Sequence, residues 1–255
     1  MTLPLSFYLV SAAVIFLTGL SKSGFGGGLG VVSVPALSVF VEPQFAVAVL
    51  MPILIGIDVL VVWRYRHDWR QDVVYAMVPG ALFGLALGLV TFQWMNADLI
   101  RLIVGLLALA FVAQHVFART RQVVSGADRR SGAFAFAALS GFASYVAHAG
   151  GPPVKGFLLR QQMDKSVFVG TNTMFFFSMN ALKTVSYTLS GLLTFDSLMV
   201  SLSVSPVLLL GVAAGTCLHK HVNQRLFTAL VYGFLTLAGV KLLSDSVMSV
   251  MAQLN

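Results

Sequence analysis

The sequence predicts an all-α polytopic membrane protein with two inverted repeats, each an interrupted helical hairpin followed by three transmembrane helices. The first observation is composition: 58% of the 255 residues are hydrophobic and only 10% are charged, whereas a soluble globule carries about 25% charged residues. The second is a mean hydropathy of +0.89. The third is the arrangement of apolar runs and basic loops, which predicts the repeats.

Apolar runs of the length that a bilayer core requires, about 20 residues, follow one another along the chain. The longest polar stretch between them is Ala118–Arg130, which leaves no room for a soluble domain. We expect two repeats, residues 1–120 and 131–255. The runs are Leu3–Val41, interrupted at Gly24–Gly30, Gln44–Trp63, Val73–Gln93, Leu99–Phe117, Ser131–Leu159, interrupted at Gly150–Pro153, Val167–Leu192, Leu198–Leu218 and Leu226–Leu243.

Most of the 16 Lys and Arg residues lie in four loops between these runs. Basic loops of membrane proteins face the cytoplasm, so both ends of the run 131–159 are expected there and the run must fold back as a hairpin. The run 3–41 is then a hairpin that opens outward, and both termini lie outside. The basic residues of the four loops are Arg64, Arg66 and Arg70; Arg119, Arg121, Arg129 and Arg130; Arg160 and Lys165; and Lys220 and Arg225.

The two halves correspond at a nearly constant spacing. Inverted halves with interrupted helices in matching places are typical of secondary transporters. The matches are Gly19 with Gly141 and Asp58 with Asn180, at an offset of 122, and Gly84 and Gly88 with Gly211 and Gly215, and Asn96 with Asn223, at an offset of 127.

The first interruption has the composition of an anion site. Unwound backbone inside a membrane needs partners from protein or water, and free N–H groups at a helix N-terminus attract anions. Lys22 adds a positive charge, and intramembrane charges are functional by default. The alternative is that the glycines only allow close helix packing. The residues expected to bind substrate here are Lys22, Ser23, Gly26, Gly27 and Gly28.

The second interruption contains Pro152 and Pro153, which cannot donate backbone hydrogen bonds and break the helix. We expect substrate contacts from His148, Gly150, Gly151 and Lys155. Because histidine titrates near neutral pH, His148 is also a candidate for ion coupling. The alternative is a structural histidine that bridges the freed backbone.

The run 167–192 carries a polar stripe of Thr173, Asn180 and Lys183 that should face the protein interior. The repeat-related run carries Asp58. A carboxylate and a lysine at similar depth can pair, so substrate could compete for the lysine or Asp58 could take a coupling proton. Helix–helix hydrogen bonding and a structural ion pair are the alternatives.

Several other classes of function lack their sequence signals. The basic residues lie in loops between apolar runs, so the net charge of +7 indicates topology and no nucleic-acid binding. The chain has no GxxxxGK[ST] motif for ATP and a single cysteine, Cys217. We expect no metal or cofactor and no enzymatic activity; the pair Ser140 and His148 only weakly suggests an intramembrane hydrolase.

From Leu3 to about Leu243, the chain resembles the TauE/SafE family of sulfite-exporter-like permeases of the toluene-sulfonate-uptake type. The resemblance lies in Gly19–Gly30 followed by Pro35, and in Gly141–Pro153 continued by Gly170-Thr-Asn172 and Asn180-xx-Lys183. It implies a bacterial inner-membrane permease for small anions, often sulfite, sulfonates or related organosulfur acids. The second signature departs from the glycine run of the first, having His148 and two prolines instead.

We therefore expect a secondary transporter that moves a small anion by alternating access, coupled to a proton or sodium gradient through Asp58 and His148. A passive anion channel and a membrane-embedded hydrolase are the alternatives. The expected partners are the anion, the lipid bilayer, a coupling ion and a second copy of the chain in a homodimer, without nucleic acid.

Overall fold

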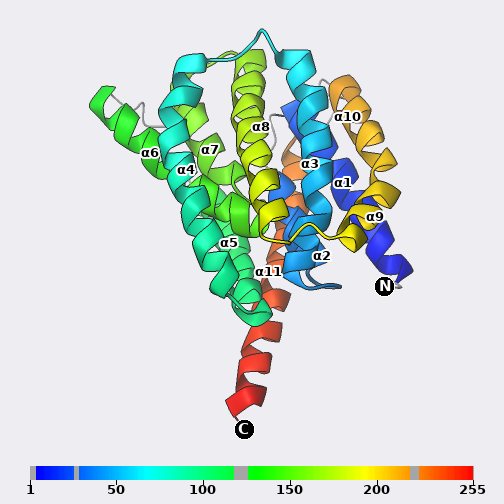
Figure 1. The fold of residues 1–255 in the computed structure, drawn as a ribbon. Coiled ribbons are helices and arrows are strands. Elements are labelled where there is room, and N and C mark those ends of the chain that lie inside the picture. Colours follow the sequence, from blue (N-terminus) through cyan, green and yellow to red (C-terminus); the bar gives the residue numbers. More distant parts are fainter. Residues whose placement is uncertain (1–3, 26–28, 118–125, 219–223, 255) are drawn as a thin grey trace.

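The computed structural model describes residues 4–25, 29–117, 126–218 and 224–254, and every regular element in this part of the chain is a helix (Figure 1). The prediction of an all-α protein is confirmed. The elements are α1 (Leu5–Phe25), η1 (Leu29–Val32), α2 (Ser33–Leu37), α3 (Pro43–Tyr65), α4 (Gln71–Trp94), α5 (Ala97–Phe117), α6 (Gly126–Ala147), α7 (Gly151–Leu158), η2 (Leu159–Gln161), α8 (Lys165–Leu189), α9 (Phe195–Val204), α10 (Pro206–Leu218) and α11 (Gln224–Leu254).

Four helices in the described part of the chain, α1, α3, α4 and α5, are long and apolar enough to cross a membrane, and α9 with α10 makes a fifth span if the bent pair counts as one. Helix α8 is long enough, at 25 residues, but its polar residues lower its hydropathy. The chain is therefore a multi-pass membrane protein.

Both predicted interruptions are breaks between helices. Helix α6 ends at Ala147 and α7 begins at Gly151, with Pro152 and Pro153 in its first turn, where their missing N–H groups cost nothing. His148 lies in the break with a positive φ of 50°. Helix α1 ends at Phe25, and η1 and α2 then pack back against α1.

The run 198–218, expected to be a single transmembrane helix, consists of two helices bent by 46° at a break, which together are long enough for one span. The bend lies between α9 and Pro206, the first residue of α10. Proline has no N–H to donate to the preceding turn and its ring clashes with the carbonyl four residues earlier. Ser205 therefore ends the α9 ladder, and its N–H donates to Leu202 O at 3.3 Å.

Helices of the first half pack mainly on helices of the second half: α4 on α6, α1 on α10, α3 on α8 and α5 on α11. Glycines permit the closest of these contacts. A Cβ at Gly84 of α4 would lie 2.0 Å from the carbonyl oxygen of Ala138 of α6, and a Cβ at Gly211 of α10 would lie 2.5 Å from that of Phe16 of α1. The two halves are thus interlocked.

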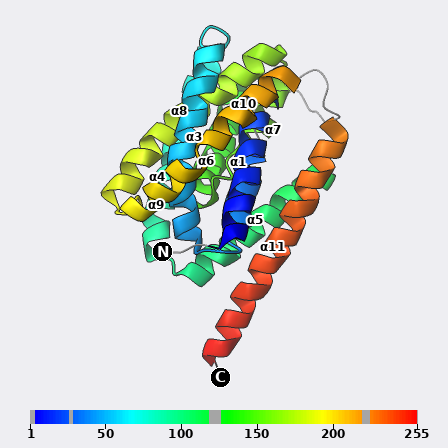
Figure 2. The same cartoon turned by 90° about the vertical axis from the view of Figure 1, so that its right-hand side faces the viewer.

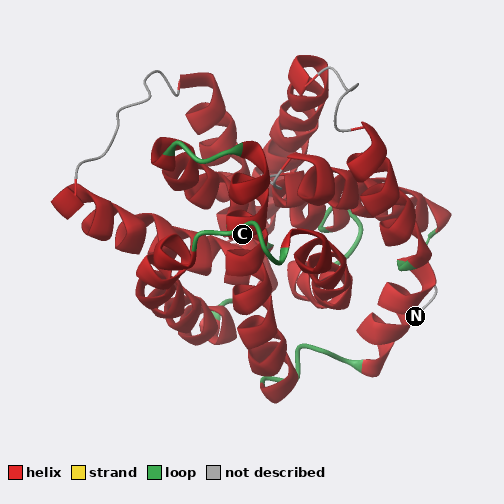
Figure 3. Ribbon diagram, turned by 90° about the horizontal axis from the view of Figure 1, so that it is seen from above, coloured by secondary structure: helices red, strands yellow, loops and turns green. Residues whose placement is uncertain are grey.

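Connections at the two ends of the molecule differ in charge. The α3–α4 turn with Arg64, Arg66 and Arg70, and the α7–α8 connection with Arg160, lie at the top of Figure 1. Both chain ends and the α4–α5 and α8–α9 connections lie toward the bottom, and Figure 2 shows α11 descending there. Figure 3 shows the same helices from above.

Candidate functional site

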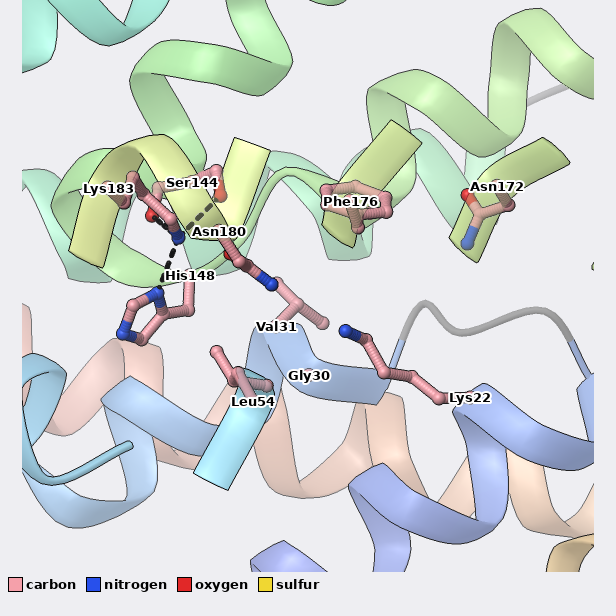
Figure 4. A pocket seen from close by; sticks show the side chains of 11 residues that line it. Lys22, Gly30, Val31, Leu54, Ser144, His148, Asn172, Phe176, Asn180 and Lys183 are labelled. Carbon is pink, nitrogen blue, oxygen red and sulfur yellow. Dashed lines mark hydrogen bonds between the residues drawn. The ribbon is translucent and has the colours of Figure 1, made fainter. Parts of the chain in front are cut away.

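A small cavity lies between the two helix breaks, about 30 Å³ in volume (Figure 4). A water needs roughly 10–15 Å³ on this measure, so the cavity has room for about two waters. Its lining residues come from α1, η1, α3, α6, α7, α8 and the break before α7, and thus from both halves: Lys22, Gly30, Val31, Leu54, Ser144, His148, Gly151, Asn172, Phe176, Asn180 and Lys183.

On one side of the cavity, the carboxylate of Asp58 bonds to side chains of two other helices. Asp58 of α3 is fully buried, and its Oδ1 forms an ion pair with Lys22 Nζ of α1. Its Oδ2 accepts a hydrogen bond of 2.6 Å from Asn180 Nδ2 of α8. The predicted pairing of Asp58 with an intramembrane lysine is therefore confirmed, and the partner is Lys22.

On the other side of the cavity, Lys183 of α8 is 1% exposed and has three neutral partners. Its Nζ lies 3.0 Å from the carbonyl oxygen of Ser144, 2.9 Å from the hydroxyl of the same residue and 2.8 Å from His148 Nδ1. The other ring nitrogen of His148 lies 2.9 Å from the carbonyl oxygen of Val47 in α3. These contacts hold the break before α7 against α8 and α3.

The buried charges of this region do not balance. Among the described residues, the buried lysines and carboxylates are Lys22, Lys183 and Asp58. With all three ionised, the site carries one net positive charge, and burial of an unpaired charge is costly. Leu54, Val31 and Phe176 form its apolar wall, and Lys22 Nζ lies 5.8 Å from the Phe176 ring centre. A small anion with an apolar or neutral part matches this lining.

The residues predicted from the sequence fall into three groups. Lys22, His148, Gly151, Asn180 and Lys183 line the cavity, and Asp58 bonds to two of them. Gly150, Thr173, Ser23 and Lys155 are described but do not line it. Gly26, Gly27 and Gly28 lie outside the described residues.

Three of the predicted residues that do not line the cavity differ in burial and contacts. The Ser23 hydroxyl lies 2.8 Å from Gly19 O and 3.1 Å from Val212 O, so it joins α1 to α10. Lys155 is half-buried on α7. Thr173 is buried, as the predicted inward stripe on α8 requires.

Six lining residues were not among the predicted site residues: Gly30, Val31, Leu54, Ser144, Asn172 and Phe176. A signal for two of them was present, because residues 172, 176 and 180 recur at intervals of four and share one helix face. Leu54 is an ordinary apolar residue in an apolar helix, so only the packing of α3 against α8 distinguishes it.

The suggested Ser140–His148 pair is not formed. The Ser140 hydroxyl is fully buried and donates to the carbonyl oxygen of Gly150 at 2.8 Å. The described partners of His148 are Lys183 and Val47. A serine without a base at hydrogen-bond distance is not an activated nucleophile.

A second cavity, about 560 Å³, lies between the α2–α3 connection, α5 and α11. Its charged lining includes Arg101 and Asp245, which are paired within their own helices: Arg101 with Asp98 at 2.9 Å and Asp245 with Lys241 at 3.0 Å. The third charged lining residue is Glu42, a carboxylate, so this cavity offers no uncompensated positive charge to an anion.

Replacement of Lys22 with methionine is expected to destabilise the protein by about 3–5 kcal/mol, because it leaves the Asp58 carboxylate buried without its cation. The double variant Lys22→Met/Asp58→Asn should recover part of that loss, since the carboxylate is removed together with its cation. Thermal unfolding of purified protein in detergent measures both. Equal stability of the Lys22→Met variant and the original protein would contradict the ion pair.

Comparison with known proteins gives one result. The family model described as "Sulfite exporter TauE/SafE" matches residues 11–242. No curated protein and no solved structure matches the chain.

Proposed function

The chain belongs to the sulfite exporter TauE/SafE family, and from that premise we propose that it is a secondary transporter for a small sulfur-containing anion, such as sulfite or an organosulfonate. The family match makes it a transporter-type membrane protein. The observation that carries the proposal is the cavity between the two breaks, which is lined by two buried lysines, of which only Lys22 is paired with a carboxylate, that of Asp58. Charged side chains at such depth mark the substrate pathway of a transporter.

The lining suits a sulfonate or sulfite group. Lys22 and Lys183 supply positive charge, and Asn172 and Ser144 supply polar groups. The N-terminus of α7 begins at the cavity with Gly151 and has no side-chain cap, so its dipole adds positive potential. Asn180 Oδ1 is buried without a hydrogen-bond partner among the described residues, which leaves an acceptor for a substrate hydroxyl or amine.

An inverted repeat is supported by the way equivalent parts meet. The residue matches make α1 equivalent to α6, α4 to α10, α3 to α8 and α5 to α11. The contact of α1 with α10 is therefore equivalent to the contact of α6 with α4. In the other two contacts, α3 with α8 and α5 with α11, each helix packs on its own equivalent. The equivalent residues Asp58 and Asn180 bond to each other, as residues near a two-fold axis do. Gly19 packs on Gly211 while its equivalent, Gly141, packs on Gly84.

The proposed mechanism is alternating access around this cavity. Transporters of inverted repeats bind substrate at broken helices near the membrane centre and rock one part against the other. The cavity, about 30 Å³, is lined by residues of both breaks, so we expect it to widen when the two hairpins separate. We place the basic turns in the cytoplasm of a bacterial inner membrane and both termini outside, and we propose coupling to an ion gradient.

The substrate class can be tested by a thermal-shift screen of purified protein against sulfite, sulfoacetate, isethionate, taurine, thiosulfate and simple carboxylates. A ligand at 100 times its Kd stabilises the folded state by about 2.7 kcal/mol. We expect a selective rise in unfolding temperature with sulfur oxyanions. No shift with any of these anions, or equal shifts with all, would contradict the proposed specificity.

Gradient coupling separates a transporter from a passive channel. In proteoliposomes that contain the protein, an imposed proton or sodium gradient should drive uptake of the anion above its equilibrium level. A channel only dissipates the anion's own gradient. Flux that never exceeds equilibrium under either gradient would favour the channel.

A further inference from the structure

The titratable side chains of the site have hydrogen-bond partners, and these partners suit one protonation state of some side chains and both states of others. Asp58 and His148 are the coupling residues expected from the sequence, but each has partners that suit a single state. Both oxygens of Asp58 face donors, the Lys22 ammonium and the Asn180 amide. A protonated carboxyl would turn an O–H toward one of these donors and lose a bond, so Asp58 is held as the carboxylate.

His148 is held in the neutral form. Its Nε2 lies 2.9 Å from the Val47 carbonyl oxygen, which can only accept, so this nitrogen carries the proton. Its Nδ1 lies 2.8 Å from the Lys183 Nζ and accepts from it. A second proton on the ring would place a positively charged imidazolium next to the Lys183 ammonium, and the two charges would repel.

Lys183 has contacts that suit both of its protonation states. As an ammonium group it has three N–H donors and three acceptors, namely Ser144 O, Ser144 Oγ and His148 Nδ1. As an amine it keeps two donors, for Ser144 O and His148, and its lone pair accepts from the Ser144 hydroxyl, which rotates to donate. All three bonds therefore persist in both states.

Charge then links the state of Lys183 to the anion. With Lys183 neutral, the charges of Lys22 and Asp58 cancel and the site without substrate has no net charge. With a monoanion bound, a protonated Lys183 restores the balance. The titratable groups around it are Lys22 of α1, Asp58 of α3, His148 in the α6–α7 break, Tyr145 of α6 and Tyr187 of α8, whose hydroxyl donates to the Tyr145 carbonyl.

We propose that Lys183 is the proton carrier of this transporter: it is a neutral amine without substrate and takes up one proton from water as each monoanion binds. Buried lysines lose their proton more readily than exposed ones. The inference rests on the proposed function and names its coupling ion. Anion and proton move together, one to one, and their combined charge is zero.

The test measures protons taken up on binding. Isethionate is a suitable probe because its sulfonate remains a monoanion, so any proton taken up goes to the protein. Calorimetry in two buffers of different ionisation enthalpy should give about one proton per bound anion. Its Kd should rise up to tenfold per pH unit above neutrality, because high pH favours the amine that does not hold the anion.

If isethionate does not bind, the probe is the best ligand of the thermal-shift screen that is also a permanent monoanion. Binding without proton uptake and with a pH-independent Kd overturns the inference and leaves the proposed function intact. Failure of every anion to bind overturns both.

Two variants separate Lys183 from Asp58 as the carrier. Arginine keeps its charge at all accessible pH values, so Lys183→Arg should bind the anion with no proton uptake. The Asp58→Asn variant should still take up about one proton per bound anion. The opposite pattern, uptake kept in Lys183→Arg and lost in Asp58→Asn, would assign the proton to Asp58. If one variant fails to fold, the other assigns the proton by itself: uptake kept in Lys183→Arg, or lost in Asp58→Asn, would overturn the assignment to Lys183.

Discussion

Anion transport is expected to be lost when Lys183 is replaced with alanine, while membrane insertion remains normal. The substitution removes the ammonium group that faces the cavity and leaves a net charge of zero in the site. Removal of one partner of a buried ion pair costs about 3–5 kcal/mol, so the loss in flux should be about 100-fold or greater. Radiolabelled anion uptake into proteoliposomes, normalised to protein content, measures the effect.

The matched control is Lys165→Ala, on the same helix. Lys165 is exposed at the first turn of α8, so its loss changes the charge of the chain equally without touching the cavity. Its flux should match that of the original protein. Equal, near-normal flux in both variants would remove Lys183 from the anion site.

The second large effect is expected at the α4–α6 contact. In Gly84→Ala, the new Cβ would lie 2.0 Å from Ala138 O and 2.9 Å from Phe142 N, and both are backbone atoms that no rotamer change can move away. The helices must separate. Overpacking costs about 1–3 kcal/mol or more, so the unfolding temperature should fall by roughly 2–12 °C, or the protein should fail to accumulate.

Gly233→Ala is the control for this substitution. A Cβ at Gly233 of α11 meets nothing within 4 Å, and alanine is the better helix former by about 0.5–1 kcal/mol. The unfolding temperature of this variant should be unchanged or higher. A Gly84→Ala protein as stable as Gly233→Ala would show that α4 and α6 do not approach as described.

The helix breaks were predictable because their causes are local. Two consecutive prolines after two glycines stop a helix regardless of its surroundings, and α6 and α7 end and begin beside them. The bend at Pro206 has the same cause, yet a single proline in an apolar run also occurs without a bend of that size; Pro52 and Pro79 both lie inside continuous helices. The outcome at such a proline depends on what packs against it.

The charged residues of the candidate site were predictable from the sequence, because burying a charge in the membrane costs free energy. Lys22, Asp58 and Lys183 are charged residues in apolar runs, and such residues need an interior partner. Their partners were not predictable. Asp58 bonds to residues 36 and 122 positions away, and Lys155, equally charged and beside a break, lies away from the cavity.

Composition and the positions of the charges were enough to establish a multi-pass helical membrane protein with two interrupted segments, because bilayer solvation acts on each residue by itself. The packing of α3 on α8 and of α6 on α4 decided that Asp58 joins Lys22 and Asn180, and that Lys183 joins Ser144 and His148. Those contacts depend on how closely distant helices approach at their glycines, which is a property of the assembled bundle.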